Sequence, residues 1–196
     1  GGIPNIKNLE KGSDLACSSW DVISGNISIE KDVILYDDNG GFPGLQAAEI
    51  IADSGSKLEI ISPERFFSPE IGGMNFVPYA KNFIEKNVKI TINKRIKEIN
   101  KKNNILSISI NSDYSDQLER KETLQVVVEH GTIPVDDLYF NLKNNSYNQG
   151  VVDYYSLIKG EFNEIVKNKN GKYFLYRVGD AISSRNIHAA IYDSLR

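Results

Sequence analysis

The pattern of apolar and polar positions predicts a βαβ unit in the first third of the chain. Val33–Tyr36 is an apolar run typical of a buried strand, and Leu58–Ile61 is a second run of this kind. Between them lies a turn rich in Asp and Gly, then a stretch with apolar residues at helical spacing. The helical positions are Leu45, Ala48, Ile51 and Ala52, and Gly55 is placed to cap the helix. This order of elements implies parallel pairing through a right-handed crossover.

A second helix is expected over residues 74–86, after a loop at 62–73 that is rich in Pro, Ser and Gly. Because Pro78 lacks an amide hydrogen, we expect it in the first turn, so the helix would begin later than Met74. The residues expected on the apolar face are Phe76, Val77, Ala80, Phe83 and Ile84.

Short alternating stretches predict further strands. One lies at 88–92, and three more, near 95–100, 105–110 and 124–129, suggest a β-meander attached to the parallel sheet. Residues 1–31 have little periodicity and indicate a connector with one short helical stretch near Ser19–Ser24. The elements expected after the meander are a helix at 136–143, an irregular segment at 144–171, a strand at Tyr173–Val178 and a helix at Ser184–Arg196.

Composition and charge exclude several classes of protein. The net charge of −3 argues against a nucleic-acid partner, which would favour a basic face. No apolar run approaches the length needed to span a bilayer, and the first residues carry no signal pattern. A single cysteine, Cys17, cannot form an internal disulfide, so we expect a reducing, cytoplasmic setting. Both ends lack linker-like sequence, which favours a piece of a larger protein.

The turn after the first strand is the first candidate site. A dinucleotide turn needs glycines so that the backbone can approach a pyrophosphate at the start of the helix. Gly40, Gly41 and Gly44 are present, but their spacing departs from G-x-G-x-x-G, and Asp38 stands where the first glycine is expected. Asp37 and Asp38 would repel a phosphate. The sequence therefore leaves two interpretations open, nucleotide binding and a tight turn with no ligand.

An acidic residue after the second strand often holds the adenosine ribose of a dinucleotide. Glu64 is placed for this role, and its neighbour Arg65 could instead hold a phosphate. Charged residues in such a loop are more commonly solvated than bound to a ligand, and this alternative stays open for both.

The dipeptide Gly179-Asp180 is the second candidate site, because it lies between a predicted strand and a predicted helix. Such a turn can direct backbone N–H groups and a carboxylate at a cofactor. His188 follows in the helix, where a surface role is favoured over catalysis.

No catalytic residue or metal site is predicted. Glu129 and His130 are adjacent, and neighbouring strand residues point to opposite faces, so they should not form an acid–base pair. Two histidines and one cysteine give no metal-ligand spacing.

Several segments resemble the C-terminal region of the NADH:flavin oxidoreductase family, which includes 2,4-dienoyl-CoA reductase and trimethylamine dehydrogenase. Gly1-Gly2-Ile3-Pro4 resembles the ATGG-x-P segment that closes the first part of the FAD domain in flavoproteins with two dinucleotide domains. The resemblance covers almost the whole chain and is closest to the N-methylproline, stachydrine and dimethylglycine demethylase type. The other segments are 33–44, 127–134, 138–140 and 175–196, with Glu129-His130-Gly131-Thr132 and Gly179-Asp180-Ala181 the most specific.

This resemblance implies a fold and cofactors. The fold would be a Rossmann-like three-layer α/β domain, with a parallel sheet and a β-meander, flanked by remnants of a split FAD domain. The implied segments are a connector at 1–25, an NAD(P)-binding-like domain at 26–150, and a linker with the returning FAD-domain segment at 151–196. FMN, a 4Fe–4S cluster and the substrate site would belong to an N-terminal TIM barrel of the same polypeptide, outside this chain.

The resemblance also implies roles for the two turns. Gly179 and Asp180 match the turn that contacts FAD or ADP, and Gly40, Gly41 and Gly44 match the NAD(P)H turn of the inserted domain. The departure at Asp38 favours the amine-dehydrogenase end of the family, where this turn has diverged.

Three hypotheses follow. In the first, the chain is a dinucleotide-binding part of an enzyme that demethylates an N-methylated amine or reduces an unsaturated substrate, with a homo-oligomer as one expected assembly. Alternatively it is a Rossmann-like scaffold without a nucleotide of its own. A phospho-acceptor signalling domain ranks last, because no acceptor Asp or Lys stands at convincing spacing.

Overall fold

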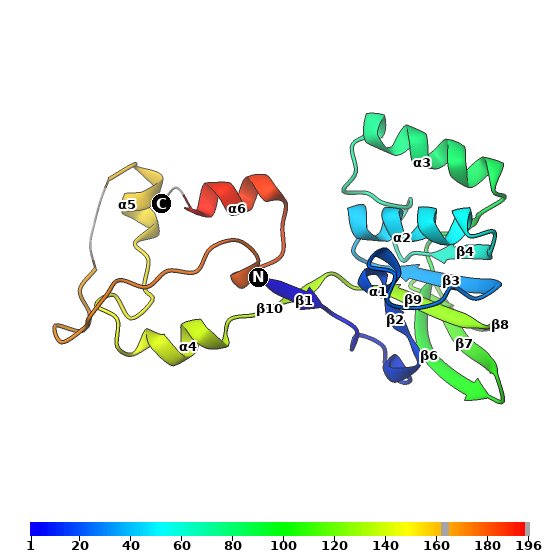
Figure 1. Cartoon of the computed structure of the whole chain (residues 1–196), viewed down its shortest axis with the longest axis horizontal. Helices are drawn as coiled ribbons and strands as arrows, with labels where there is room; N and C mark the ends of the chain where they lie inside the picture. Colours follow the sequence, from blue (N-terminus) through cyan, green and yellow to red (C-terminus); the bar gives the residue numbers. More distant parts are fainter. Residues whose placement is uncertain (162–164, 195–196) are drawn as a thin grey trace. The chain divides into compact units, whose positions relative to one another are not determined.

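The apolar runs predicted as strands lie side by side in a parallel sheet, as the computed structural model of residues 1–161 and 165–194 shows (Figure 1). Strand β3 (Asp32–Asp37) pairs with β4 (Lys57–Ile61) on one side and with β9 (Gln125–Glu129) on the other. Two short strands, β2 (Cys17–Ser18) and β5 (Lys89–Thr91), complete the order β2-β9-β3-β4-β5. The predicted α/β class is confirmed.

Different layers cover the two faces of this sheet. On one face, Leu35, Ile60 and Val127 pack in a cluster with apolar residues of helix α2 (Phe42–Asp53). Helices α1 (Ser19–Ile23) and α3 (Gly73–Glu85) contribute Val22 and Phe83 to that cluster. On the other face, Ile34, Ile61 and Val128 pack against the antiparallel meander. The three layers are therefore helices, parallel sheet and meander.

The meander consists of β6 (Arg95–Lys102), β7 (Ile105–Ser112) and β8 (Ser115–Thr123). Strand β8 was not predicted, because it has no apolar alternation and most of its residues are exposed. The predicted third strand of the meander, near 124–129, is instead β9 of the parallel sheet. That assignment was wrong because an apolar run does not indicate which sheet it joins.

Helix α3 departs from its prediction at two points. It begins at Gly73, so Pro78 lies in the helix interior and not in the first turn. The missing N–H of Pro78 leaves one carbonyl of the preceding turn open, and that turn is exposed to solvent, with Met74 92% exposed. Val77 and Ile84 were expected on the apolar face, but they are 64% and 78% exposed. The buried contacts of α3 come from Phe76, Tyr79 and Phe83.

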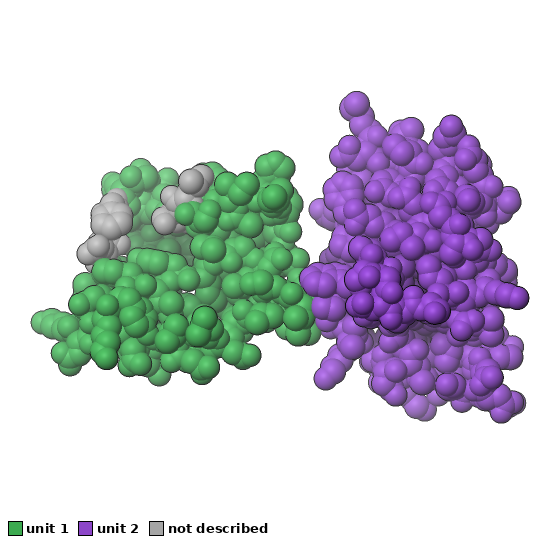
Figure 2. All heavy atoms as spheres, viewed as in Figure 1, with its two compact units in different colours: residues 1–3, 132–196 green, residues 4–131 purple. Residues whose placement is uncertain are grey.

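The chain divides into two compact units (Figure 2). Unit 2 is Pro4–Gly131 and contains the sheet, the helices described above, the meander and a short 3-10 helix, η1 (Ser13–Leu15). Unit 1 is Gly1–Ile3 together with Thr132–Arg196. The expected division at residues 25 and 150 concerns which nucleotide-binding domain each segment belongs to, and it stays a prediction.

Unit 1 consists of short elements. Its chain begins with β1 (Gly2–Pro4) paired to β10 (Thr132–Pro134). Its helices are α4 (Asp137–Lys143), α5 (Tyr154–Ile158), the 3-10 helix η2 (Gly179–Ala181) and α6 (Ile187–Ser194). No helix in the described part of the chain is long and apolar enough to cross a bilayer.

The strand predicted at Tyr173–Val178 is not formed. The segment has no regular secondary structure and pairs with no strand among the described residues. Its backbone is held instead by Asn148, whose side-chain amide accepts from the N–H of Leu175 (2.9 Å) and donates to its carbonyl (2.8 Å). The helix expected from Ser184 begins at Ile187, and its last two predicted residues, 195–196, lie outside the described residues.

The meander should contribute to stability through its inner face. Ile108 is fully buried on β7, whereas Ile105 on the same strand is 42% exposed. We expect Ile108→Ala to lower the free energy of unfolding by about 2–5 kcal/mol, because it removes buried apolar volume and leaves a cavity. Ile105→Ala should cost less than about 1 kcal/mol. Urea unfolding of both variants checks this, and equal losses would contradict the assigned core.

Candidate functional site

The turn from β3 into α2 lies at the switch point of the parallel sheet. From β3 the order continues through β4 and β5 on one side and through β9 and β2 on the other. In open α/β sheets, ligands bind in the crevice at the carboxyl ends of the strands where the order reverses. The turn 38–41 and the end of β9 lie at this carboxyl edge of the sheet. The predicted residues Asp38, Gly40, Gly41 and Gly44 are therefore brought together where a dinucleotide would be expected.

The start of α2 fixes how the glycines of this turn should be counted. Gly41 is the N-cap, Phe42 is the first helical residue, and Gly44 lies in the first turn. Gly41 and Gly44 thus have the spacing of the last two glycines of G-x-G-x-x-G. Counting back places Asn39, and not Asp38, at the first glycine position.

Asp37, which was not singled out as a site residue, occupies the centre of the turn. Its Oδ1 accepts hydrogen bonds from the backbone N–H groups of Asn39 (3.0 Å) and Gly40 (2.7 Å). The side chain is fully buried, and its Oδ2 has no hydrogen-bond partner among the described residues. A Cβ on Gly44 would lie 2.1 Å from Oδ2, so glycine is required at position 44 by Asp37 itself.

The buried carboxyl groups at this edge of the sheet favour the neutral form. Burial raises the pKa of Asp37 to about 7, and the nearby Glu129 and Asp38 carboxyls act in the same direction, against the two amide hydrogen bonds. Burial also raises the pKa of Glu129, although Ser19, Asn39 and the N–H of Gly131 all donate hydrogen bonds to it. Carboxyl groups gathered at this edge are unfavourable for a pyrophosphate.

Two side-chain contacts join the end of β3 to the end of β9, its neighbour in the sheet. Asp38 Oδ1 and His130 Nδ1 are 2.9 Å apart, and the His130 side chain is fully buried. Asn39 Nδ2 donates to Glu129 Oε1 over 3.1 Å. Glu129 and His130 thus have different partners, and their side chains share no hydrogen bond in the described structure. No local pattern could have shown these pairings, because the partners are about 90 residues apart.

A loop covers the outer side of the same turn. Gly40 has a positive φ of 72°, and a Cβ at this position would lie 2.6 Å from the ring of Pro69. The N–H of Glu70 donates to the carbonyl of Gly40 (3.2 Å). Gly40 is therefore required by contacts within the protein, both for its backbone conformation and for the loop packed on it.

Glu64, the predicted ribose ligand, lies in the loop that follows β4. It is exposed, and its carboxylate makes no hydrogen bond within the described part of the chain. Its position at the carboxyl edge fits the predicted role, but no contact joins it to the turn 38–41, and the role stays a prediction.

The Gly179-Asp180 turn in unit 1 is built differently. Gly179 is buried, has a φ of 57°, and donates its N–H to Asp193 Oδ2 (3.2 Å). Asp193 also forms an ion pair with Arg185. A Cβ on Gly179 would lie 3.2 Å from the Cβ of Ala190, so a glycine allows α6 to pack closely here. Asp180 is half-buried, and its carboxylate has no hydrogen bond in the described structure.

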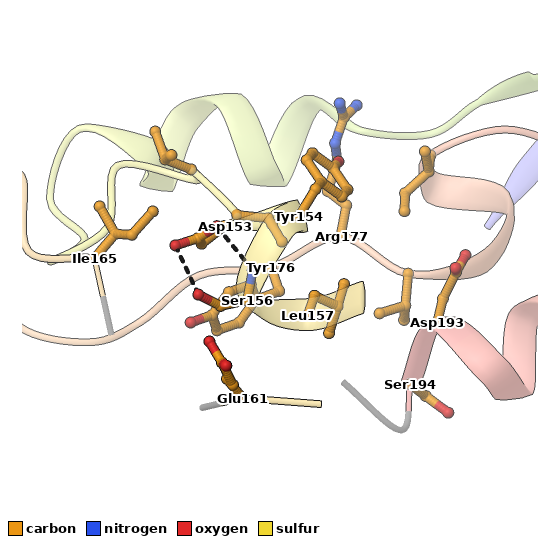
Figure 3. Close-up of a pocket in the computed structure, with 14 residues that line it drawn as sticks. Asp153, Tyr154, Ser156, Leu157, Glu161, Ile165, Tyr176, Arg177, Asp193 and Ser194 are labelled. Atoms are coloured by element: carbon orange, nitrogen blue, oxygen red, sulfur yellow. Dashed lines mark hydrogen bonds between the residues drawn. The ribbon is translucent and has the colours of Figure 1, made fainter. Parts of the chain in front are cut away.

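Unit 1 contains a cavity of about 430 Å³, and residues on both sides of this turn in the sequence line it (Figure 3). Tyr176 and Val178 from the segment 173–178, Leu157 from α5 and Ile182 after η2 supply apolar wall. Arg177 also borders it, lies over the ring of Tyr139 at 4.5 Å from its centroid, and pairs with Asp136 (2.6 Å). His188 is exposed on α6 and lines no part of this cavity.

Comparison with known proteins gives relatives along the whole chain, although no protein-family profile matches. The chain is 43% identical over 196 residues to a probable N-methylproline demethylase of Rhizobium meliloti (strain 1021). It is 31% identical over 191 residues to the N,N-dimethylglycine/sarcosine dehydrogenase of Chromohalobacter salexigens. These matches cover 100% and 95% of this chain, but only 29% and 28% of the relatives, so the chain spans less than a third of their length.

A solved structure has the same fold. Histamine dehydrogenase from Rhizobium sp. 4-9 matches 98% of this chain and 28% of its own, with a TM-score of 0.72 at 15% identity. At that identity the likeness is evidence for the fold alone. The two relatives confirm the resemblance found in the sequence. This chain belongs to the NADH:flavin oxidoreductase family and is homologous along its whole length to part of these demethylases and dehydrogenases.

Proposed function

We propose that this chain is the dinucleotide-fold part of a flavin-dependent oxidoreductase that removes a methyl group from an N-methylated amine. The 43% identity to an N-methylproline demethylase supports this parent activity over an enoate-type reductase. The reacting flavin, FMN, would supply the electron chemistry and a 4Fe–4S cluster would pass electrons on. Both, with the substrate, would be held by a TIM-barrel domain of the same polypeptide.

The Gly179-Asp180 turn is the proposed contact of this chain with the ADP portion of a flavin nucleotide. The observation that carries this assignment is the Asp180 carboxylate, which is half-buried and accepts no hydrogen bond in the described structure. It is free to accept a hydrogen bond from a sugar hydroxyl. The backbone beside it is fixed, because Gly179 is held by Asp193 and packed on α6. The residues present therefore fit this group.

The packing of unit 1 supports its place within a larger domain. In its described residues, no large apolar side chain is fully buried, and the buried side chains there are Ser146, Asn148 and Asp193. Large apolar residues such as Tyr155, Ile158 and Ile187 are instead 71–84% exposed. A unit of this size needs an apolar core to be stable. We therefore place the missing core in parts of the polypeptide outside this chain.

Unit 2 has a second candidate function, that of a scaffold without its own nucleotide. The contacts Asp38–His130 and Asn39–Glu129 favour it, because they join β3 to β9 across the crevice that a dinucleotide would enter. In this reading, unit 2 supports neighbouring domains or contacts between copies of the enzyme.

The Asp180 carboxylate should be required for nucleotide affinity. We expect Asp180→Asn to weaken binding of FAD or ADP by the full-length protein about tenfold, the size of one charge-assisted hydrogen bond of about 1.4 kcal/mol. Asp137→Asn, an exposed acid on α4, serves as the matched control and should leave affinity unchanged. Calorimetric titration measures both, and equal affinities for the two variants would contradict the assignment.

The chain alone should show no turnover. We expect no oxidation of N-methylproline or dimethylglycine and no reduction of alkenes by the purified 196-residue chain, because the hydride chemistry belongs to the flavin. The measurement is formaldehyde release and absorbance of a redox dye. Turnover without an added flavoenzyme would place a catalytic centre within this chain.

Unit 2 should lose stability between about pH 4 and pH 7. The pKa of Asp37 is 3.8 when exposed and about 7 when folded, so the folded state holds an extra proton in this window. The free energy of unfolding should therefore fall by a few kcal/mol, at most about 4, as the pH rises through it. The raised pKa of Glu129 acts in the same direction.

Asp37→Asn should remove much of this pH dependence, because the amide does not ionise. Asp116→Asn, an exposed acid on β8, is the control and should keep it. Urea unfolding at pH 4.5 and pH 7.5 measures the difference. Identical pH profiles for wild type and Asp37→Asn would show that Asp37 is ionised throughout.

A further inference from the structure

We propose that Arg177 is a positioning residue for the Gly179-Asp180 turn of unit 1. Its guanidinium group attaches this turn to helix α4, so that the Asp180 carboxylate is held in one place for a bound nucleotide. This inference rests on the flavin-nucleotide contact proposed for Asp180, and it names the residue that fixes that contact.

Arg177 and Ala181 lie on either side of Gly179-Asp180 in the sequence, and a hydrogen bond joins them. Arg177 Nη1 donates to the carbonyl of Ala181 over 3.4 Å. Ala181 is the last residue of η2, the 3-10 helix that contains Asp180. The side chain of Arg177 therefore closes a loop of backbone around the proposed nucleotide contact. Because Asp180 lies within this loop, a change in the loop changes where its carboxylate lies.

Helix α4 fixes the guanidinium group of Arg177. Nη1 also donates to Asp136 Oδ2 over 2.6 Å, and the two side chains are only 27% and 26% exposed. The guanidinium carbon lies 4.5 Å from the ring centroid of Tyr139 and 5.2 Å from that of Phe140. A planar guanidinium group can stack on an aromatic ring and still donate hydrogen bonds from its edge. The group is therefore held by α4 independently of its contact with the turn.

The ion pair uses a carboxylate that could have capped α4. Asp136 is the N-cap residue of that helix, where an Asp side chain usually accepts from backbone N–H groups of the first turn. In the described structure the Asp136 side chain makes no such bond and pairs with Arg177, 41 residues further along the chain. The contact with Arg177 thus replaces a local interaction of the helix.

A second attachment holds the same turn on α6. The N–H of Gly179 donates to Asp193 Oδ2 over 3.2 Å. The turn is thus attached to α6 through Gly179 and to α4 through Ala181, with Asp180 between the two points. An acceptor that is held at both ends loses little freedom when it binds a ligand, and this favours affinity. Loss of Arg177 removes one attachment and leaves the other.

The experiment is a double-mutant cycle of Arg177→Met and Asp180→Asn in the full-length protein, freed of bound nucleotide and titrated with ADP in a calorimeter. We expect Arg177→Met to weaken ADP binding about fivefold, because the carboxylate stays and only its position relaxes. This loss is smaller than the loss of about tenfold expected for Asp180→Asn. In the Asp180→Asn background, Arg177→Met should cause no further loss.

Lys143→Met is the matched control. It removes a positive charge and an aromatic contact from the same helix, since Lys143 Nζ lies 5.8 Å from the ring centroid of Phe140, but it leaves the hydrogen bonds of the turn in place. Its affinity for ADP should equal that of the wild type.

Thermal unfolding separates positioning from stability alone. Arg177→Met should lower the melting temperature equally in the wild-type and Asp180→Asn backgrounds, because the contacts of Arg177 with α4 do not involve Asp180. A folded Arg177→Met variant that binds ADP as tightly as the wild type would overturn the proposal. An equal loss of ADP affinity in both backgrounds would also overturn it, because Arg177 would then act independently of Asp180.

Failure of this inference can be told from failure of the nucleotide contact. If Asp180→Asn weakens ADP binding and Arg177→Met does not, the positioning role alone is wrong. If Asp180→Asn binds ADP like the wild type, the proposed contact is wrong, and the positioning role is wrong with it.

Arg177→Lys covers the case in which Arg177→Met does not fold. Lys keeps the charge beside Asp136 but lacks the planar group that lies on the ring of Tyr139, so it should hold Ala181 less well. The same loss of ADP affinity, dependent on Asp180, is expected. Wild-type affinity in Arg177→Lys would then overturn the proposal.

Discussion

Strand β3 has no solvent-facing side, and the arrangement of unit 2 depends on this. Helices cover Val33 and Leu35 on one face of the central sheet, and the meander covers Ile34 and Tyr36 on the other. A strand buried on both faces must end where its backbone can turn without exposing unpaired groups. Asp37 provides that ending, because its carboxylate accepts the first N–H groups of the turn. The contacts of Asp38 with His130 and of Asn39 with Glu129 follow directly after it.

The two glycine-containing turns of the chain show different reasons for keeping a glycine. At Gly40 and Gly44, the neighbours that forbid a side chain are Pro69 and Asp37, both from the same unit. At Gly179 the neighbour is Ala190 of α6, but the next residue, Asp180, has a carboxylate without a hydrogen bond in the described structure. In the first turn, Asp37 accepts the N–H groups of Asn39 and Gly40 within the turn itself, whereas the second turn leaves the half-buried carboxylate of Asp180 without a donor in the described structure. This difference is the basis for the proposal that a nucleotide binds at the unit 1 turn.

The sequence predicted the elements that carry local patterns. Val33–Tyr36, the helix through Ala48 and the cap at Gly55 were all identified, because apolar spacing and a positive-φ glycine act within a few residues. Strand β8 was not predicted, because its polar sequence forms a strand only through pairing with β7. Tyr173–Val178 has the composition of a strand but no partner strand among the described residues. The candidate turns were found from glycines, whereas Asp38–His130 and Asn39–Glu129 depend on a fold that joins distant segments.

The contact of Gly44 with Asp37 separates two reasons for keeping a glycine, ligand binding and folding, which usually act at the same position. A glycine that is needed only for contact with a ligand is no longer under selection once ligand binding is lost, and it can then be replaced by other residues. A glycine that also accommodates a buried carboxylate remains under selection for folding. Gly44 can therefore persist through generations in which the ancestral binding activity has disappeared. A glycine-rich turn of this kind is evidence of common ancestry. Whether it still binds a ligand has to be judged from the contacts that its residues make.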